Sequence, residues 1–414
     1  MADCLVLGAG IVGVSIAIHL AQRGKTVVLV DRKDAGEETS YGNAGLIQRE
    51  GVAPYGFPQD LGEILRYGLN DKIDMHYHPT ALPAVAPFLY RYWRASHPDN
   101  YARIKREYEP LIRHCLEEHG ALIEAAGAAS LIEKKGWYRV FRTTEKRDSQ
   151  IAEAQKLERE FGVRHAALDG AQMAEREPGL GGVVVGALHW TDPWSIRDPG
   201  ALVKSYRDLF EQLGGTVVRA DAMGLERKGA GWALPGGIEA AEAVVALGPW
   251  AGDLTSRLGY NLPLGVKRGY HMHYGQSGNQ PLTNWVQDAE RGYMLAPMAN
   301  GVRLTTGAEF AERDAPSTPV QLEKAEAAAR EVLPGLGGRL EGTPWRGARP
   351  CTPDMMPVIG KAPQHDGLWF AFGHAHHGMT LGPVTGRMIA EMMTGEAPFI
   401  DPKPYRAERF GRIR

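Results

Sequence analysis

A glycine pattern near the amino terminus constrains the fold of this chain more than any other feature. The spacing G-x-G-x-x-G over residues 8–13 lies between an apolar run, residues 3–7, and a helical pattern over residues 11–22. A second apolar run, residues 26–30, follows directly. A strand, a helix and a strand within about 30 residues predict two parallel strands joined by a crossover helix. The amino-terminal region is therefore expected to be an α/β unit.

The same glycines indicate what this unit binds. Gly8, Gly10 and Gly13 would let the backbone approach a pyrophosphate at the amino end of the helix. Asp31 follows Gly8 by 23 residues, where a carboxylate accepts hydrogen bonds from an adenosine ribose. The pattern predicts a dinucleotide site but does not separate NAD from FAD. A tight turn with Asp31 as a strand-end cap is the alternative, and it would require these features to coincide by chance.

Length, charge and cysteine content narrow the class of protein. The 414 residues suit about two or three domain-sized units. The formal net charge of -2 provides no positive field for nucleic acid, which we exclude as a partner. The three cysteines include no CxxC pair, which indicates a reducing compartment and a cytoplasmic protein. No apolar run reaches the roughly 18 residues of a membrane span.

Periodicity predicts the remaining elements. Apolar positions at helical spacing predict one long helix over residues 100–126, and residues 50–100 are interpreted as a capping insertion. Two or three strands are expected within residues 266–310. Further helices are expected over residues 144–161, 200–213, 320–332 and 383–393, and strands that return to the first sheet over residues 216–220 and 243–247.

Two motifs near the carboxy terminus carry a family resemblance. They read W-R-G-A-R-P-C-T-P-D-x-x-P-V-I-G and G-H-x-x-x-G-x-T-L-x-P-x-T-G, and the first 46 residues and Ala246-Leu247-Gly248-Pro249-Trp250 add to the pattern. Together these segments resemble the D-amino acid oxidase superfamily of FAD-dependent oxidoreductases, most of all bacterial D-amino-acid dehydrogenases and glycine oxidases. The resemblance spans nearly the whole chain, although residues 50–100 and 130–195 match only loosely.

The resemblance implies a fold and a division into domains. The fold class is α/β, or α+β overall, with a discontinuous Rossmann-like FAD-binding domain and a second, largely antiparallel substrate domain. The FAD-binding domain would comprise residues 1–128, 195–265 and 344–414. The substrate domain would comprise residues 129–194 and 266–343.

The resemblance also implies the cofactor and the residues that hold it. Relatives that tether flavin use a cysteine at the position that Gly347 occupies here, so we expect FAD to be non-covalent and Cys351 to be an ordinary thiol. The expected cofactor-binding residues are Gly8, Gly10, Ile11, Val12, Gly13, Asp31, Arg32, Ser40, Asn43, Gly45, Leu46, Met223, Gly248, Trp250, Gly378, Met379 and Thr380.

Catalytic roles fall to three residues, namely Arg349, Tyr293 and His376. The resemblance implies that Arg349 holds the substrate carboxylate, and a planar guanidinium suits such bidentate binding; a structural ion pair is the alternative. Tyr293 is expected to reach the same carboxylate, with Tyr270 and Tyr55 as weaker rivals.

The histidine-rich loop near residue 375 invites other readings. His376 is expected to face substrate or flavin, and His374 to make a structural hydrogen bond. Closely spaced histidines that include His377 lack a third kind of ligand nearby, so we expect no metal.

The implied function is oxidative deamination of a D-amino acid or a cyclic D-imino acid such as a D-proline type. Hydride would pass from Cα to flavin N5, and the imine would hydrolyse to a 2-oxo acid. The alternatives are a glycine or sarcosine oxidase that uses oxygen, NAD-dependent hydride transfer, and a non-catalytic flavoprotein that carries electrons or serves as a subunit.

The electron acceptor is left open among a quinone, an electron-transfer partner and oxygen. Residues 88–94 mix aromatic and basic side chains, and Arg406, Arg409, Arg412 and Arg414 crowd the carboxy terminus. These groups suggest peripheral contact with the inner face of a membrane as one interpretation, and a solvated helix and tail as the other.

Overall fold

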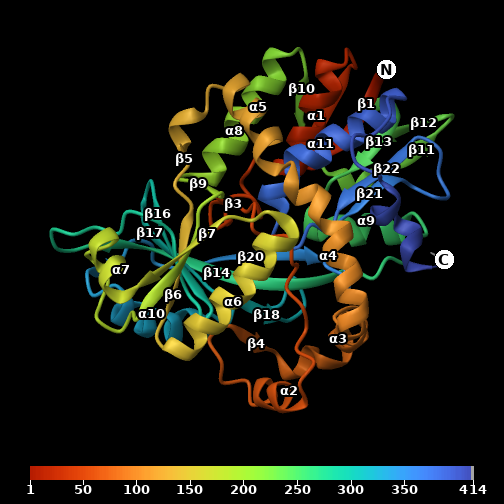
Figure 1. The fold of residues 1–414 in the computed structure, drawn as a ribbon. Coiled ribbons are helices and arrows are strands. Elements are labelled where there is room, and N and C mark those ends of the chain that lie inside the picture. Colours follow the sequence, from red (N-terminus) through yellow and green to blue (C-terminus); the bar gives the residue numbers. More distant parts are fainter. Residues whose placement is uncertain (412–414) are drawn as a thin grey trace.

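The amino-terminal unit lies within a sheet of eight strands in the computed structural model, which describes residues 1–411 (Figure 1). The strand order is β10-β2-β1-β13-β12-β11, and β22 pairs with β13 and β21. Pairing is parallel from β10 through β13 to β22, which confirms the predicted parallel unit and the two returning strands. The strands are β1 Ala2–Leu7, β2 Val27–Asp31, β10 Thr216–Arg219, β11 Glu226–Lys228, β12 Gly231–Leu234, β13 Ile238–Val245, β21 Val358–Lys361 and β22 Leu368–Phe372.

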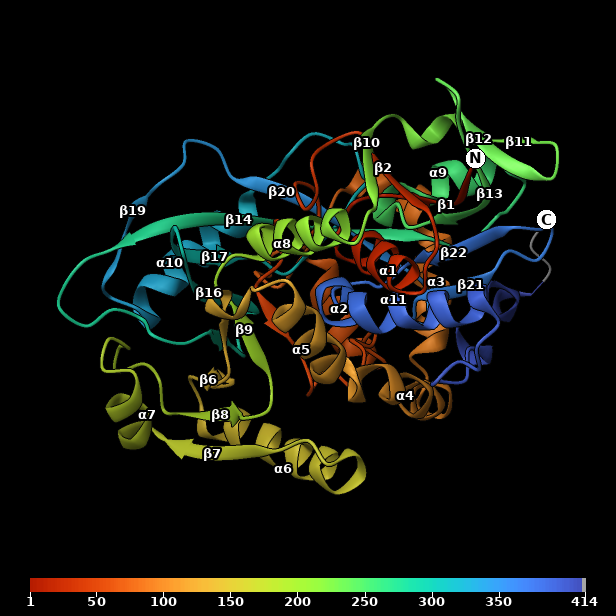
Figure 2. The same cartoon turned by 90° about the horizontal axis from the view of Figure 1, so that it is seen from above.

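Both faces of this sheet are covered. Cys4 and Val6 of β1 pack in the core beneath the helices, whereas Leu5 and Leu7 pack in a second core on the opposite face. Alternate side chains of a strand point to opposite faces, so a strand covered on both faces reads as a continuous apolar run. The helices on the first face, seen together in Figure 2, are α1 Ile11–Gln22, α5 Cys115–Ala125, α8 Pro199–Gln212 and α11 Gly378–Thr394. The opposite face carries α9 Ala251–Arg257.

Helix α11 begins five residues before the predicted start at 383. Pro383 lies inside the helix, where a proline removes one hydrogen-bond donor, and the prediction placed the start at this residue. Glycines hold the first turns against α1: a Cβ at Gly382 would lie 2.7 Å from Ile11 Cγ1, and one at Gly386 2.7 Å from the Ser15 carbonyl oxygen. Tertiary packing therefore extends the helix beyond its local signal.

A second sheet of eleven strands, within the described residues, is organised around the long strand β14. Its neighbouring pairs are antiparallel except for β15 with β6 and β18 with β4, so the sheet is largely antiparallel as expected. The segment 266–310 contributes five strands rather than two or three. The strands are β4 Met75–Tyr77, β6 Trp137–Phe141, β7 His165–Asp169, β8 Gly186–Trp190, β14 Gly265–Gln276, β15 Val286–Asp288, β16 Tyr293–Met298, β17 Gly301–Thr305, β18 Ala308–Phe310, β19 Leu336–Arg339 and β20 Trp345–Cys351.

Strand β20 connects the two sheets. It lies in the segment 344–414 that we assigned to cofactor binding, yet it pairs with β14 from Gly265↔Cys351 to His271↔Trp345. A boundary at residue 344 therefore cuts through the large sheet, and the division into domains stays a proposal. The helices of this half are α6 Thr144–Phe161, α7 Gly170–Arg176 and α10 Val320–Val332, and a small third sheet joins β3 Leu46–Ile47, β9 Trp194–Ile196 and β5 Ile132–Glu133.

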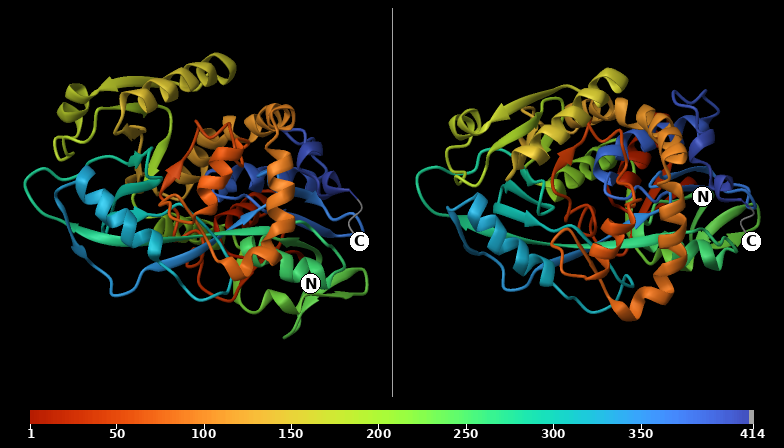
Figure 3. Two further views of the ribbon diagram at one scale, coloured as in Figure 1. Left: turned by 90° about the horizontal axis from the view of Figure 1, so that it is seen from below. Right: turned by 60° about the horizontal axis from the view of Figure 1, so that its bottom comes forward.

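The segment 50–100 crosses the beginning of β14 (Figure 3). It contains α2 Leu61–Gly68, β4 and α3 Leu82–Ala95. The Phe88 ring of α3 occupies the space that a Cβ of Gly265 would need, with a closest approach of 2.6 Å. This segment therefore covers the large sheet where β14 and β20 pair.

The predicted single helix over residues 100–126 is wrong. Two helices stand there, α4 Pro98–Arg113 and α5, and His114 separates them with φ −89° and ψ −2°. Pro110 lies one turn before the break and cannot donate a backbone hydrogen bond, which weakens the ladder at that place.

Candidate active site

One large cavity runs from the glycine turn of the first sheet to the β14–β20 pair of the second. Its volume is about 1580 Å³. The Gly8 turn lies in its wall together with Asp31, Trp250, Arg349 and His376. This arrangement brings the predicted cofactor site and the predicted substrate residues to one continuous space.

The glycine turn fits a bound dinucleotide. Gly8 has φ +109°, and a Cβ there would lie 2.4 Å from the Ala246 carbonyl oxygen, so another residue would be both strained and blocked. A Cβ at Gly13 would lie 1.8 Å from the Gly8 carbonyl oxygen. Gly10 is the N-cap of α1 and faces the cavity near Ser40, whose Oγ accepts a 3.1 Å hydrogen bond from the Ile11 amide. The helix thus directs its positive end at the space where a pyrophosphate would lie.

The other end of the dinucleotide site also has suitable groups. The Asp31 carboxylate accepts hydrogen bonds from the amides of Ala9, at 2.7 Å, and Lys33, at 3.0 Å, which fix it at the end of β2. The Arg32 guanidinium lies 4.2 Å from the Trp250 ring centroid. The guanidinium of Arg32 and the indole of Trp250 attract each other and form one side of the cavity next to the Asp31 carboxylate. An FAD molecule would have its adenosine here, and the residues present fit it.

Most of the predicted cofactor residues meet at this cavity, and three do not. Gly13 and Gly45 shape the backbone behind it, and a Cβ at Gly45 would lie 2.4 Å from the Ile196 carbonyl oxygen. The Thr380 hydroxyl is buried and accepts from the Gln48 amide at 3.2 Å, so it joins α11 to the chain after β3. The predicted residues that line the cavity are Gly8, Gly10, Ile11, Val12, Asp31, Arg32, Ser40, Asn43, Leu46, Met223, Gly248, Trp250, Gly378 and Met379.

Arg349 lies on the cavity wall without an acidic partner. Its Nη1 donates to the carbonyl oxygens of Arg268, at 3.2 Å, and Gly307, at 3.1 Å, and its Nη2 donates to the Thr306 carbonyl oxygen at 3.4 Å. The guanidinium lies over Gly269, where a Cβ would come within 2.6 Å of Nη2. No carboxylate within residues 1–411 forms an ion pair with it, and burial lowers its pKa from the ordinary value. Backbone carbonyls thus orient a cation toward the cavity while its charge stays unneutralised.

Two of the three candidate tyrosines, Tyr293 and Tyr55, border the cavity with side chains that differ in their surroundings. Tyr293 lines the cavity, but its hydroxyl lies beside the ion pair of Arg142 and Asp288, whose Nε–Oδ2 distance is 2.8 Å. Tyr55 also lines the cavity, and its ring centroid lies 4.5 Å from that of His376. The buried Tyr293 hydroxyl has no hydrogen-bond partner within the described residues, so Tyr293 stays the predicted carboxylate contact and Tyr55 stays its rival.

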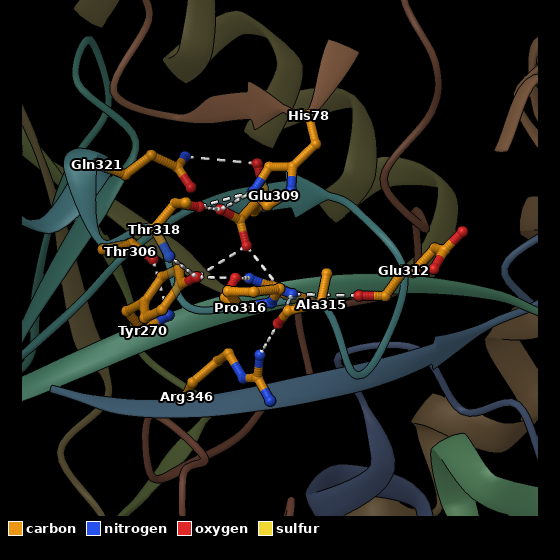
Figure 4. Close-up of polar contacts among 12 residues, drawn as sticks. His78, Tyr270, Thr306, Glu309, Glu312, Ala315, Pro316, Thr318, Gln321 and Arg346 are labelled. Atoms are coloured by element: carbon orange, nitrogen blue, oxygen red, sulfur yellow. Dashed lines mark hydrogen bonds and ion pairs between the residues drawn. The ribbon is translucent and has the colours of Figure 1, made fainter. Parts of the chain in front are cut away.

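Tyr270 is occupied by a buried polar network behind the sheet (Figure 4). Its hydroxyl donates to Glu309 at 2.9 Å and accepts from Arg268 Nη2 at 2.8 Å and from the Thr318 amide at 2.9 Å. Arg268 and Glu309 form a fully buried ion pair of 2.7 Å. Tyr270 therefore holds the strands together and is not available to a substrate.

The ligand atoms of His76, His78 and Glu309 lie within 4.8 Å of one another, which is close enough to suggest a metal site. Glu309 is already neutralised by Arg268, and His78 Nε2 lies 2.7 Å from Thr318 Oγ1. We assign this group to the structural network.

The three histidines of the loop before α11 have separate surroundings. His374 Nε2 lies 2.9 Å from Thr385 Oγ1, in agreement with the expected structural bond, and His377 Nδ1 lies 2.7 Å from the Tyr108 hydroxyl. His376 lines the cavity next to Arg349, and its pKa is well below the ordinary value because of burial and neighbouring positive charge. A neutral imidazole at this place can donate or accept one hydrogen bond without adding charge.

Sequence reasoning missed Lys267. It lies on β14 opposite Arg349, lines the same cavity, and has its pKa lowered to about 8, chiefly by burial. The sequence carried no distinct signal, because Arg268 follows Lys267 directly in β14 and nothing local tells which of the two cations faces the cavity.

Comparisons with known proteins agree with this geometry. The sequence pattern of the family described as FAD dependent oxidoreductase (DAO) matches residues 3–392. A D-amino-acid oxidase of Bradyrhizobium diazoefficiens is 30% identical, with 98% of each chain covered. A D-amino acid dehydrogenase of Chromohalobacter salexigens is 29% identical, with 96% of this chain and 97% of that protein covered. Among solved structures, glycine oxidase from Geobacillus kaustophilus has a TM-score of 0.76 at 20% identity, covering 99% of this chain and 98% of that chain, which is a likeness of fold.

Proposed function

Because the chain belongs to the family of FAD-dependent oxidoreductases, we propose that it oxidises a D-amino acid whose carboxylate binds to Arg349. The observation that carries the proposal is the guanidinium of Arg349, which has no acidic partner within the described residues and lies on the wall of the cavity that the glycine turn also lines. FAD, when bound, supplies the acceptor for the two electrons that leave the substrate Cα–H bond. The oxidase and dehydrogenase relatives named above support an amino acid substrate.

The chain's own residues position the substrate. Three backbone carbonyls hold the guanidinium, because Arg349 Nη1 donates to Arg268 and Gly307 and Nη2 donates to Thr306. The Nε–H and the second Nη2–H are left for a paired contact with a carboxylate. Tyr55 and His376 border the same place, so one can hydrogen-bond a carboxylate oxygen and the other the amine. With the carboxylate fixed and the acceptor on one side, only one direction of the Cα–H bond is productive. This reasoning predicts that one enantiomer is favoured, and the D-amino-acid oxidase and D-amino acid dehydrogenase relatives support the D enantiomer.

The experiment is an anaerobic titration of the holoenzyme with D- and L-amino acids, sarcosine and D-proline, followed by flavin absorbance. We expect D-amino acids to bleach the flavin and their L enantiomers to leave it oxidised. Bleaching by L enantiomers would contradict the proposed orientation, and preference for sarcosine would favour a glycine or sarcosine oxidase. Absence of bleaching with every compound would favour a flavoprotein that only carries electrons.

We further propose that the acceptor is reached at a membrane surface through α2. Leu61, Leu65 and Leu69 follow one another at helical spacing and are 74%, 74% and 72% exposed. Tyr90 and Trp93 of α3 stack on each other at 6.2 Å and are also exposed. An exposed apolar stripe on a short amphipathic helix is suited to insertion at the level of the lipid headgroups.

Other groups expected to contact a membrane have different roles. Phe88 and Tyr92 are buried, and Arg409 forms an ion pair of 2.8 Å with Asp354. Arg412 and Arg414 lie outside the described residues. Within residues 1–411, none of the helices combines the length and apolar character needed to cross a bilayer.

Flotation of the holoenzyme with anionic lipid vesicles tests this contact. Leu65→Asp should reduce the fraction that floats, whereas Leu340→Asp, at a leucine 57% exposed elsewhere on the surface, should leave it unchanged. Equal flotation of both variants and the wild type would exclude α2 as the contact.

A further inference from the structure

The cavity wall contains a second cation, Lys267, to which the proposed reaction assigns no role. Lys267 and Arg349 are directly opposite in the antiparallel pair of β14 and β20, so their side chains leave the sheet on the same face. Their head groups then diverge. The guanidinium lies back over Gly269, while the Lys267 Nζ lies 2.9 Å from the Tyr92 hydroxyl and 4.0 Å from the centroid of its ring.

The surroundings of the ammonium are apolar and aromatic. Its Nζ lies 3.9 Å from Met355 Sδ and 5.7 Å from the centroid of Phe310. Phe310 and Met355 belong to one apolar cluster together with the buried Cys351. Tyrosine and phenylalanine rings attract a cation with their faces but do not neutralise it. This compartment is therefore an apolar recess of the cavity with a positive charge at its wall.

Neither cation has an acidic neighbour within the described part of the chain. No ion pair to a carboxylate is formed by Lys267 or by Arg349 there, although the structure contains many ion pairs elsewhere. The positive charge of Arg349 lowers the pKa of Lys267, and both cations lower the pKa of His376. Two adjacent, half-buried cations without a counter-charge in one cavity are costly, so the arrangement is suited to a ligand that brings two negative charges.

We propose that Lys267 binds a second anionic group, and that the preferred substrates are D-amino acids whose side chain ends in a carboxylate, such as D-glutamate or D-aspartate. The inference rests on the proposed function, because it gives the α-carboxylate to Arg349. The apolar recess contacts the methylene groups of the side chain, and the ammonium receives its terminal carboxylate. A substrate with an uncharged side chain leaves the ammonium without a partner.

Anaerobic flavin reduction by D-glutamate and by D-glutamine, which has the same length and no second charge, tests the inference. We expect the wild-type holoenzyme to favour D-glutamate by at least about tenfold in kcat/KM. Lys267→Met should lower the efficiency with D-glutamate by roughly 10-fold to 150-fold and change that with D-glutamine by less than about threefold. Lys267→Arg should recover part of the preference, because it keeps the charge.

Lys361→Met is the matched control, because this lysine is exposed and pairs with Asp366 at 3.3 Å. It should behave as the wild type. Equal use of the two substrates by the wild type, or a parallel loss of both in Lys267→Met, would overturn the inference; the parallel loss would mean that Lys267 shares the α-carboxylate with Arg349.

A binding titration separates this inference from the proposed reaction. Glutarate and butyrate bind without turnover, and each should perturb the flavin absorbance of the holoenzyme. We expect Lys267→Met to weaken glutarate and leave butyrate unchanged, even if no D-amino acid reduces the flavin. Unchanged glutarate affinity in the variant would refute a second anion site.

Discussion

At the scale of single residues, the site depends on cations held by neutral groups. Arg349 is oriented by backbone carbonyls of Arg268 and Gly307, and Lys267 by the hydroxyl and ring of Tyr92. Acidic partners would neutralise both before a substrate arrived. Neutral partners keep the charges directed while leaving them available, which is the electrostatic requirement for capturing an anionic ligand.

Arg349→Ala should therefore lower kcat/KM by roughly 10-fold to 150-fold, because a charge-assisted hydrogen bond is worth about 1.5–3 kcal/mol. Arg349→Lys should recover only part of the loss, since a point charge replaces the planar fork. Steady-state kinetics and FAD content measure the effect. Arg346→Ala, on the same strand but bonded to the Ala315 carbonyl, should keep kcat/KM near the wild-type value. Loss of FAD or unfolding in Arg349→Ala, with unaltered carboxylate affinity in the remaining holoenzyme, would assign Arg349 a structural role instead.

Gly10→Val should yield mostly apoprotein. A Cβ at residue 10 would lie 3.3 Å from Ser40 Oγ, and the branched side chain would fill the space over the amino end of α1. The ratio of flavin to protein absorbance after purification measures the result. Wild-type flavin content in a folded Gly10→Val protein would mean that the pyrophosphate lies elsewhere.

At the scale of elements, the contact of α1 with α11 sets the position of the cofactor turn. Both helices begin at the cavity, and Gly386 lets α11 approach the backbone of α1 at Ser15. The segment before α11 carries the three histidines and leads into Gly378 and Met379 of the cavity wall. Packing between two helices thus determines where two distant cofactor-binding segments meet.

Two glycine-to-alanine substitutions should differ in their effect on the free energy of unfolding. Gly386→Ala should lower the free energy of unfolding by about 1–3 kcal/mol, because its Cβ would lie 2.7 Å from the Ser15 carbonyl oxygen and force the helices apart. Gly252→Ala, in α9, should be neutral or stabilising by up to about 1 kcal/mol, because its Cβ would meet Leu264 at an ordinary 3.6 Å and alanine favours helix. Thermal unfolding of both holoenzymes compares them, and equal shifts would show that the helix contact tolerates a methyl group.

At the scale of the whole molecule, buried neutral histidines couple stability to pH. Burial lowers the pKa of His119 to about 4 and of His19, His374 and His377 to about 3. In the unfolded chain these groups titrate near 6.5. The unfolded state therefore binds more protons between these values, so stability should fall as pH decreases from about 6.5 toward 3, by up to about 1.4 kcal/mol per pH unit for each histidine.

Thermal unfolding of the holoenzyme between pH 7 and pH 5 should show this decrease in Tm. His119→Gln should make the slope of Tm against pH shallower, because it removes one group that is protonated in the unfolded chain and neutral in the native state. The imidazole bonds to the Met379 carbonyl oxygen at 2.7 Å and lies between the helices α5 and α11. An unchanged slope in a folded variant would mean that His119 is protonated in the native state.

Acid or heat should release intact FAD from the precipitated protein. Gly347 offers no nucleophile at the position where some relatives tether flavin, and Cys351 is buried with a raised thiol pKa. Absorbance of the supernatant measures the released flavin. Flavin retained on the washed precipitate would contradict non-covalent binding.

The sequence by itself determined the elements whose signals are local. Strand β1, helix α1 and strand β2 follow from a buried run, a glycine turn and a second buried run, and the pattern that predicts the cofactor residues of this unit is local. Tertiary structure alone decided which side chains share the substrate end. Lys267 meets Arg349, which is 82 residues later in the chain, because β14 pairs with β20, and Tyr55 meets His376 because the segment 50–100 covers that pair. Periodicity indicates which face of an element is buried, but it does not indicate which distant element covers that face. The role of the charged residues at this site depends on that pairing of distant elements.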